Sequence, residues 1–239
     1  EENIAYIRIT TFNEQTTSGL EKAIKKHREE LGDKLVGFVL DLRNNPGGLL
    51  DQSLVLADSF LDKGEIVSIR GRNPDRDRSH MAVKGDLAKG VLMVVLINAG
   101  SASASEIVAS ALQFHGRATL MGGQSFGKGS VQTILPLPVE GGIRMTTALY
   151  YAPNGNTIQA RGVTPDIFLN PSKETKQRRE SDLPGAIAAV GKQSRKAKSR
   201  PTVPEDACPS VGEKEDRQLG CALAFLHAGS AKNFLAMIG

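Results

Sequence analysis

Two short stretches of the sequence carry side chains that could act together as a nucleophile and a base. The first contains Ser101, Ser103 and Ser105 and follows the apolar run of residues 91–97. A hydroxyl held between a buried strand and a helix lies beside free backbone N–H groups and the positive end of the helix dipole. Those groups would stabilise the oxyanion that forms when a serine attacks a carbonyl. Each of these serines would also serve as an ordinary helix N-cap, and this stretch alone favours that simpler interpretation.

The second stretch, residues 125–132, places Lys128 between Gly127 and Gly129. Glycines permit close backbone approach, and a lysine held among packed neighbours loses hydration, which favours the neutral amine that can take a proton from serine. The stretch has some likeness to a phosphate-binding loop, with Gly123 five residues before the lysine. Such a loop requires Ser or Thr directly after the lysine, where this chain has Gly129, so a nucleotide site is excluded.

Strands and helices must position these two stretches, and the sequence alternates between them. Apolar runs predict strands, and apolar residues at helical spacing predict helices, the first of which is expected to begin at the capping box Ser18-x-x-Glu21. Buried strands followed by Gly-rich turns and helices indicate an α/β fold, with the turns at the sheet edge where such folds bind ligands. The expected strands are residues 4–9, 35–42, 91–97 and 144–151, and the expected helices are 18–31, 50–61, 103–114 and a short one at 219–226.

The net charge of +4 is concentrated in one polar stretch and does not indicate a nucleic-acid partner. Residues 172–205 carry nine Lys or Arg against four acidic residues, a charge of +5, which leaves the remainder of the chain at −1. This stretch lacks the interleaved aromatic side chains on which bases stack, and its Pro and Gly content favours a solvated linker. No apolar run in the sequence reaches the ~20 residues that a membrane-spanning helix needs.

Cys208 and Cys221 lie close together near the end of the chain. They have no CxxC spacing, and the nearest histidine, His227, completes no zinc pattern. They are therefore either a disulfide in an oxidising compartment or two unrelated thiols. The histidines all lie outside the two stretches described above, which disfavours a Ser-His-Asp triad.

Four motifs occur together in one order along the chain. They are residues 41–48 (DLRNNPGG), 100–106 (GSASASE), 126–132 (FGKGSVQ) and 150–155 (YYAPNG). In this combination the sequence resembles the carboxyl-terminal processing peptidases, the tail-specific proteases of peptidase family S41, over roughly residues 1–170. The resemblance implies an α/β fold with a ββα-superhelix core similar to crotonase- and Clp-protease-like folds. It implies no metal and no cofactor.

The same resemblance assigns catalytic roles to three residues. Ser103, the central serine of its motif, matches the nucleophile, and Lys128, 25 residues later, matches the general base. Gln132 matches the residue that orients the lysine. The implied activity is that of a serine endopeptidase with a Ser-Lys dyad, which cleaves extended or unfolded polypeptides near their C-terminal region.

Backbone groups and two further positions complete the implied site. The N–H of Ala104, together with that of Gly47 or Gly48, matches the oxyanion hole, and the choice between the two glycines stays open. Glu106 matches an acidic position to which no role is assigned. Some members of the family have an aspartate where this chain has Phe114, so an acidic partner from that position is missing here.

The resemblance covers a Ser-Lys peptidase core at residues 1–170 and matches no motif beyond it. Composition and helical spacing indicate a basic polar linker at residues 171–206 and a C-terminal helical tail at 207–239. The family places a substrate-capturing PDZ domain before the strand at Ile4, and a chain that begins at this strand is expected to lack it. The expected partners are polypeptide substrates and, through the tail, a second copy of the chain. The family also implies the bacterial periplasm or another extracytoplasmic compartment, with membrane association of the full-length protein.

Two other functions fit parts of the same pattern. A catalytically silent scaffold of the same fold would hold peptides without activating Ser103, and a fluorophosphonate label on that hydroxyl would distinguish it from a peptidase. An acyl-CoA-handling enzyme of crotonase type would need Gly-rich oxyanion loops but no Ser-Lys pair. Turnover of a CoA thioester would reveal this second alternative.

Overall fold

A parallel sheet forms the centre of the molecule. The computed structural model describes residues 3–171, 177–191, 200–213 and 215–238. Within these residues, six strands form a sheet in the order β1-β2-β5-β6-β9-β10, and every neighbouring pair is parallel. The strands are β1 (Ile4–Arg8), β2 (Gly37–Asp41), β5 (Leu92–Ile97), β6 (Thr119–Gly122), β9 (Ile167–Asn170) and β10 (Thr202–Pro204). The predicted α/β fold class is confirmed.

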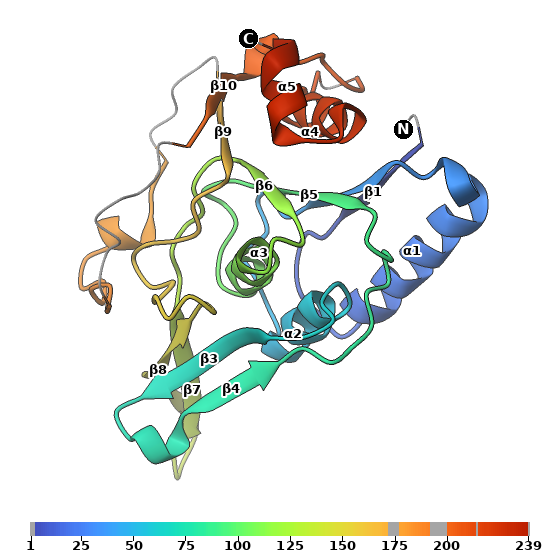
Figure 1. Ribbon diagram of the computed structural model, residues 1–239. Helices are drawn as coiled ribbons and strands as arrows, with labels where there is room; N and C mark the ends of the chain where they lie inside the picture. Colours follow the sequence, from blue (N-terminus) through green and yellow to red (C-terminus); the bar gives the residue numbers. More distant parts are fainter. Residues whose placement is uncertain (1–2, 172–176, 192–199, 214, 239) are drawn as a thin grey trace.

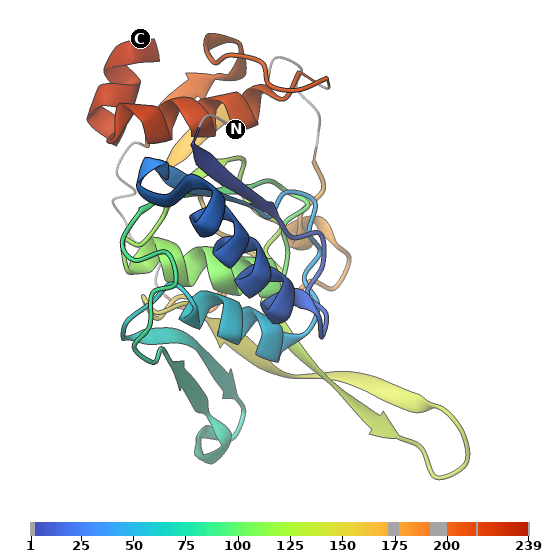
Figure 2. The same cartoon turned by 90° about the vertical axis from the view of Figure 1, so that its right-hand side faces the viewer.

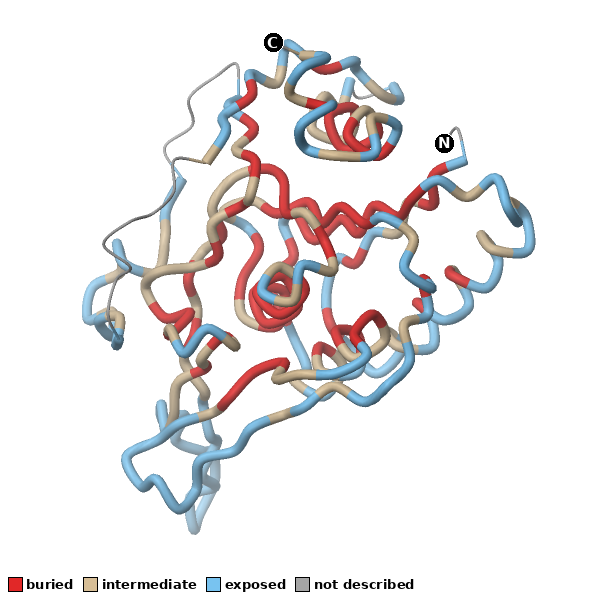
Figure 3. The backbone as a smooth tube through the Cα atoms, in the orientation of Figure 1, coloured by how far each residue is buried: buried red, intermediate tan, exposed pale blue. Residues whose placement is uncertain are grey.

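Helices cover both faces of this sheet, as Figures 1 and 2 show. One face packs against α1 (Thr16–Leu31), α2 (Leu50–Asp58) and α3 (Ala104–Phe114), and the other against α4 (Arg217–Ala228) and α5 (Ala231–Ile238). β2 is therefore buried along its whole length and β5 along all but its first residue, which explains their near-continuous apolar runs (Figure 3). Among the described residues, no helix combines the length and the hydropathy needed to cross a membrane.

A second, antiparallel sheet lies beyond α2 and α3. Its described strands run in the order β4-β3-β8-β7, and the hairpin of β7 and β8 projects from the body of the molecule (Figure 2). The alternating sequence predicted β8, whereas nothing in the sequence analysis predicted β3, β4 or β7. The strands are β3 (Glu65–Gly71), β4 (Arg78–Met81), β7 (Ser130–Pro136) and β8 (Gly142–Tyr151), and the short 3-10 helices are Gly32–Lys34, Pro74–Arg76, Glu180–Asp182 and Glu205–Ala207.

The predicted start of α1 was wrong. The helix begins at Thr16, and the hydroxyl of Ser18 donates to the carbonyl of Gln15 instead of capping the helix. The side chain of Asn13 accepts from the N–H of Gln15, while the Thr16 hydroxyl accepts from the N–H of Asn13. These local side chain to backbone hydrogen bonds start the turn two residues before the motif that resembles a capping box.

The stretch predicted as a linker contributes to the sheet. Within residues 171–206, strand β10 pairs in parallel with β9, and the helix predicted around residues 219–226 is present as α4. Residues 172–176 and 192–199, which hold most of the basic side chains of this stretch, lie outside the described residues. The division into core, linker and tail at residues 170 and 206 stays a prediction.

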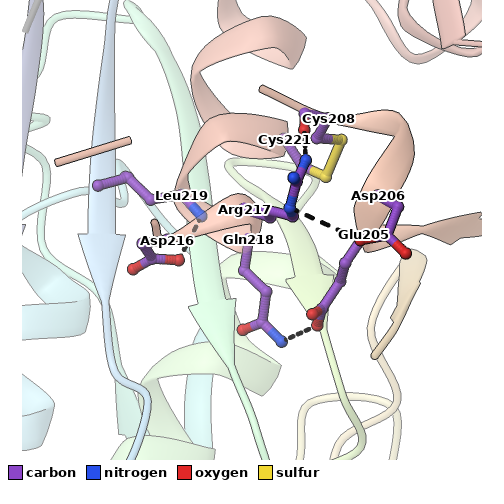
Figure 4. Close-up of a disulfide and its surroundings, with 8 residues drawn as sticks. All are labelled: Glu205, Asp206, Cys208, Asp216, Arg217, Gln218, Leu219 and Cys221. Carbon is purple, nitrogen blue, oxygen red and sulfur yellow. Dashed lines mark hydrogen bonds and ion pairs between the residues drawn. A yellow bond between two sulfur atoms is a disulfide. The ribbon is translucent and has the colours of Figure 1, made fainter. Parts of the chain in front are cut away.

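A disulfide joins Cys208 to Cys221 (Figure 4). Both cysteines are buried in the apolar cluster that α4 forms with the sheet. Next to them, the Arg217 guanidinium donates to the Cys208 carbonyl over 2.9 Å, and Asp216 caps α4 by accepting from the N–H of Leu219 at 2.9 Å. The bond therefore attaches the segment before α4 to the helix itself.

We expect reduction of this disulfide to lower the free energy of unfolding by about 2–3 kcal/mol, because the bond closes a short loop in the unfolded chain. Denaturant unfolding with and without reductant measures the effect. The variant with both Cys208→Ala and Cys221→Ala is the control, since its stability should not respond to reductant. Two titratable thiols in unfolded, non-reduced protein would contradict the pairing.

Candidate active site

Ser103 occupies a strained turn between β5 and α3. Its backbone dihedrals are φ 54° and ψ −114°, a region that side chains other than glycine rarely adopt. Strain of this kind persists only where surrounding contacts impose it, and it is concentrated at functional sites. The adjacent Ala104 is the first residue of α3, so Ser103 lies at the N-terminus of that helix.

The structure separates the three serines of this motif. Ser101 donates from its hydroxyl to the carbonyl of Leu42 at 2.8 Å, and Ser105 donates to the carbonyl of Asn45 at 3.0 Å. Both serines are fully buried, so their hydroxyls hold distant segments together. Ser103 is half-buried, and its side chain makes no such long-range hydrogen bond to a described residue. Of the three serines, Ser103 is therefore the one whose hydroxyl does not hold a distant segment in place.

The two glycines of the 41–48 motif have different surroundings. The N–H of Gly47 donates to the side chain of Asn45 at 2.9 Å, and a Cβ on Gly47 would lie 2.9 Å from the Cβ of Ser103 and 3.0 Å from the nitrogen of Ala104. Gly47 therefore allows the close approach of the two loops. Gly48 is exposed, and neither its N–H nor that of Ala104 has an acceptor among the described residues. These two N–H groups are the donors that remain for an oxyanion.

Asn45 fixes the glycine loop to the serine turn. Its side-chain amide donates to the carbonyl of Ile9 at 2.8 Å while its oxygen accepts from Gly47. Its own carbonyl accepts from the N–H of Ala102 at 3.0 Å and from the Ser105 hydroxyl. The side chain is fully buried and both of its polar ends are paired. Such a satisfied buried network fixes the relative position of the segments that it joins.

Glu106 connects the serine turn to the lysine loop. One oxygen of its carboxyl group accepts from the N–H groups of Ser103 at 2.8 Å and Lys128 at 2.9 Å. The other accepts from the Ser125 hydroxyl at 2.5 Å and from the N–H of Gly127 at 2.7 Å. Burial raises the pKa of Glu106 to about 7, and these hydrogen bonds act in the opposite direction. The backbones of the candidate nucleophile and the candidate base thus share one buried carboxyl group.

Close packing explains the glycines beside Lys128. A Cβ on Gly129 would lie 2.2 Å from the nitrogen of Gln159, and Gly127 has φ 97° with the backbone of Gly162 against it. Both agree with the close approach expected from the sequence. The N–H of Gly129 also donates to the Gln159 side chain at 2.9 Å. The loop is therefore held from both sides, by Glu106 and by residues 159–162.

No hydrogen bond links the side chains of the predicted catalytic residues within the part of the chain that the structure describes. Lys128 is half-buried, and no hydrogen bond joins its amine to the hydroxyl of Ser103 within the described residues. Gln132 is exposed on β7 and makes no described hydrogen bond to Lys128. Phe114 lies at the far end of α3 and is 52% exposed. The roles predicted for Ser103, Lys128 and Gln132 remain predictions, supported for the first two by the shared attachment to Glu106.

An ion network ties the 41–48 motif to α4. Arg43 donates to Asp41 at 2.8 and 2.9 Å and to Asp216 at 2.7 and 2.9 Å, and the Tyr6 hydroxyl donates to Asp41 at 2.8 Å. Burial, followed by the bond to Asp41, raises the pKa of Tyr6 to about 12. Burial opposes ionisation of Asp216, but hydrogen bonds from Arg43 outweigh it and lower the Asp216 pKa. The network holds Asp216 as a carboxylate against Arg43 and fixes the 41–48 motif to the start of α4.

Sequence reasoning left the connecting residues without a function. Glu106 was recognised only as an acidic position, and Asn45 and Ser125 were given no role. One signal was present for Glu106, because Ser103-x-x-Glu106 has the spacing of a capping box in which the glutamate accepts from the N–H of the serine. Nothing local marks Ser125, since its partners lie far away along the chain. For Asn45 only the bond from Gly47 is local, and the partners that make it a connecting residue, Ile9 and Ser105, are distant.

The chain matches known proteins over the segment that carries this site. The sequence profile described as peptidase family S41 matches residues 3–169. A carboxy-terminal-processing protease of Bartonella bacilliformis is 48% identical over 233 residues, which cover 95% of this chain and 52% of that protein. A chloroplastic C-terminal processing peptidase of Tetradesmus obliquus is 34% identical over 191 residues, covering 80% of this chain and 39% of that protein.

A solved structure matches as well. The photosystem II D1 C-terminal processing protease superposes with a TM-score of 0.64 at 35% sequence identity, over 70% of this chain and 42% of that one. The chain thus spans about half the length, or less, of the proteins that it matches. The matched region contains the turn of Ser103, the loop of Lys128 and the motif at residues 41–48.

Proposed function

Because the chain belongs to peptidase family S41, we propose that it is a serine endopeptidase of the carboxyl-terminal processing type, with Ser103 as nucleophile and Lys128 as general base. The observation that carries the proposal is the buried carboxyl group of Glu106, which accepts from the N–H groups of both residues. An unrelated serine and lysine would have no reason to share such an attachment. The strained backbone of Ser103 supports the same assignment.

The proposed reaction is acyl transfer from a peptide bond to Ser103. The amine of Lys128 takes the hydroxyl proton as the serine oxygen attacks the scissile carbonyl. The N–H groups of Ala104 and Gly48, which have no acceptor among the described residues, would donate to the oxyanion. Lys128 then gives its proton to the leaving amine, and water hydrolyses the acyl-enzyme. Gln132 is proposed to orient the lysine, from its position on β7.

The proposed substrates are extended or unfolded polypeptides, cleaved near their C-terminal region. This choice is supported by the names of the matched proteins, which describe carboxy-terminal and C-terminal processing. The disulfide of Cys208 and Cys221 favours an oxidising, extracytoplasmic compartment such as the periplasm. Association of two copies through residues 207–239 is also proposed, and α5 leaves Met237 60% exposed at this end of the molecule.

Incubation with an unfolded protein of known C-terminus, followed by mass spectrometry of the products, tests the proposal. We expect new C-termini near the end of the substrate and acylation of Ser103 by a fluorophosphonate. Cleavage rates for two substrates that differ only in having an apolar or a charged C-terminus then show whether this protein recognises the C-terminus of its substrate. Absence of both cleavage and labelling would contradict the function.

Replacement of Glu106 by glutamine is expected to lower both stability and turnover. One carboxyl oxygen accepts from Ser103 and Lys128 and the other from Ser125 and Gly127, so an amide group must direct its NH₂ at two donors whichever way it is turned. We expect the free energy of unfolding to fall by about 2 kcal/mol or more. Turnover should fall about a hundredfold, because a displacement of ~1 Å between reacting groups has an effect of that size. Denaturant unfolding and cleavage rates measure the two effects.

Glu106 also predicts how stability depends on pH. Its pKa is raised from 4.5 to about 7 in the folded protein, so the folded state binds this proton more tightly than the unfolded state. Its contribution to the free energy of unfolding is therefore fully present below about pH 4.5 and is lost as the pH rises towards 7. The Glu106→Gln variant should lack this dependence, whereas Glu140→Gln, at an exposed position of the β7–β8 hairpin, should retain it. Parallel stability profiles for the wild type and Glu106→Gln would contradict the prediction.

A further inference from the structure

A pocket of about 390 Å³ lies between the C-terminal half of α3 and the segment that follows β8. Neither Ser103 nor Lys128 belongs to its described lining, so it is separate from the candidate active site. The side chains that give it its character are Gln113, Gln124, Arg161, Arg179 and Arg200. We propose that this pocket binds a small oxyanion of the phosphate class.

The charge of the pocket is positive and largely uncompensated. Arg161, Arg179 and Arg200 line it, and no described lining residue is acidic. Arg161 donates to the side chain of Asn156 and to the carbonyl of Gly191, and Arg179 donates to the carbonyl of Arg161. Neither guanidinium has an ion pair with a described carboxylate. Two guanidinium groups that line one cavity without a paired carboxylate repel each other, and an anion bound between Arg161 and Arg179 would offset this repulsion.

Arg200 adds to this positive charge from another segment. Its guanidinium donates to the carbonyls of Thr164 and Pro165, and Asp166 is 3.7 Å away, which is a long ion pair on a partly exposed group. This contact neutralises one of the three cations only in part. The described lining of the pocket therefore has a net positive charge, to which Arg161, Arg179 and Arg200 contribute from segments that are distant in the sequence.

A donor without an acceptor points to a ligand of this kind. The Nε of Arg179 is buried and has no hydrogen-bond partner among the described residues. Buried donors are nearly always paired in folded proteins, so an orphaned guanidinium N–H beside a cavity indicates a missing acceptor. Arginine presents several N–H groups in a fixed plane, which match the oxygens of a phosphate better than a neutral or an apolar ligand.

The pocket adjoins the loop that carries Lys128. Gln124, which lines the pocket, donates to the carbonyl of Arg161 at 2.8 Å, and the same carbonyl accepts from Arg179 at 2.6 Å. The N–H of Glu180 donates to the carbonyl of Phe126 at 3.1 Å. An anion that joins Arg161 to Arg179 would therefore fix the segments on which the lysine loop rests.

Calorimetric titration of the Ser103→Ala chain with inorganic phosphate, at an ionic strength held constant with KCl, tests the proposal. Binding measured on this variant does not depend on turnover, so its outcome is independent of the proposed function. We expect one saturable site that sulfate also occupies and that acetate fills much more weakly. Binding of acetate as tight as that of phosphate would overturn the assignment to the phosphate class, and absence of saturable binding would overturn the site.

Variants locate the site. Arg179→Gln and Arg161→Gln should each raise the dissociation constant at least tenfold, while Arg178→Gln, an exposed neighbour outside the pocket lining, should leave it unchanged. Arg179→Lys keeps the positive charge but lacks the guanidinium Nε, so this variant should also bind phosphate more weakly. It replaces the glutamine variants in the test if they fold poorly. Equal affinity in Arg178→Gln and Arg179→Lys would contradict the proposal.

Discussion

Replacement of Ser103 by alanine is expected to reduce turnover by on the order of 10⁴-fold or more, because the hydroxyl is the proposed attacking group. The fold should be retained. Alanine has the same Cβ as serine, so the positive φ of this residue is no more strained than before. The backbone N–H that donates to Glu106 is also unchanged. Cleavage rates and fluorophosphonate labelling, together with denaturant unfolding, measure both expectations.

Ser101→Ala and Ser105→Ala are the matched controls. Each removes a buried hydroxyl that holds a distant carbonyl, so each should lower the free energy of unfolding by about 1 kcal/mol. Turnover by the folded fraction should be retained in both. If either variant lost activity while Ser103→Ala remained active, the assignment of the nucleophile would be wrong.

Replacement of Lys128 by arginine is expected to reduce turnover by about 10²–10⁴-fold, the usual contribution of a general base. A guanidinium stays protonated at any workable pH and cannot accept the proton of Ser103. The backbone N–H of residue 128 still donates to Glu106 in this variant, so the loop should keep its position. Rates measured over a range of pH, beside unfolding curves, separate loss of the base from loss of structure.

Lys84→Arg is the control for this substitution, because Lys84 is exposed and lies outside the site. Its turnover should equal that of the wild type. Activity in Lys128→Arg at the level of Lys84→Arg would exclude the lysine as the base, and the reaction would then need another group close to Ser103.

The central sheet could be predicted because its strands are buried on both faces. β2 and β5 are continuous apolar runs, and the helices that follow them have apolar residues at helical spacing. In the antiparallel sheet, alternation predicted β8, but no strand signal in the sequence marked β3, β4 or β7. β7 is mostly exposed, so its residues alternate neither in burial nor in hydrophobicity, and pairing with β8 rather than local sequence makes it a strand. Pairing with neighbouring strands in the folded protein, rather than local sequence, therefore determines that β3, β4 and β7 are strands.

The candidate site could be located from its motifs, but its connections could not. Ser103 has a positive φ where it lies close against Gly47 of the 41–48 loop, and no local sequence pattern encodes this dihedral. Likewise, only the structure distinguishes Gly47, whose N–H is bound by Asn45, from Gly48, whose N–H has no described acceptor. A single buried carboxyl group that joins segments about 20 residues apart is visible only once the chain is folded.

Helices α4 and α5, which cover the second face of the sheet, also determine whether a shortened form of this chain would stay soluble. The apolar cluster between the sheet and α4 contains Val39, Val94 and Leu96, which are fully buried. A chain shortened to end at residue 170 would keep every catalytic motif but would expose this face to water, and Arg43 would lose Asp216. Exposed apolar sheets of this kind aggregate. Proteolytic removal of the last helices would therefore promote aggregation, although residues 41–48, 100–106 and 126–132 would remain unchanged in sequence.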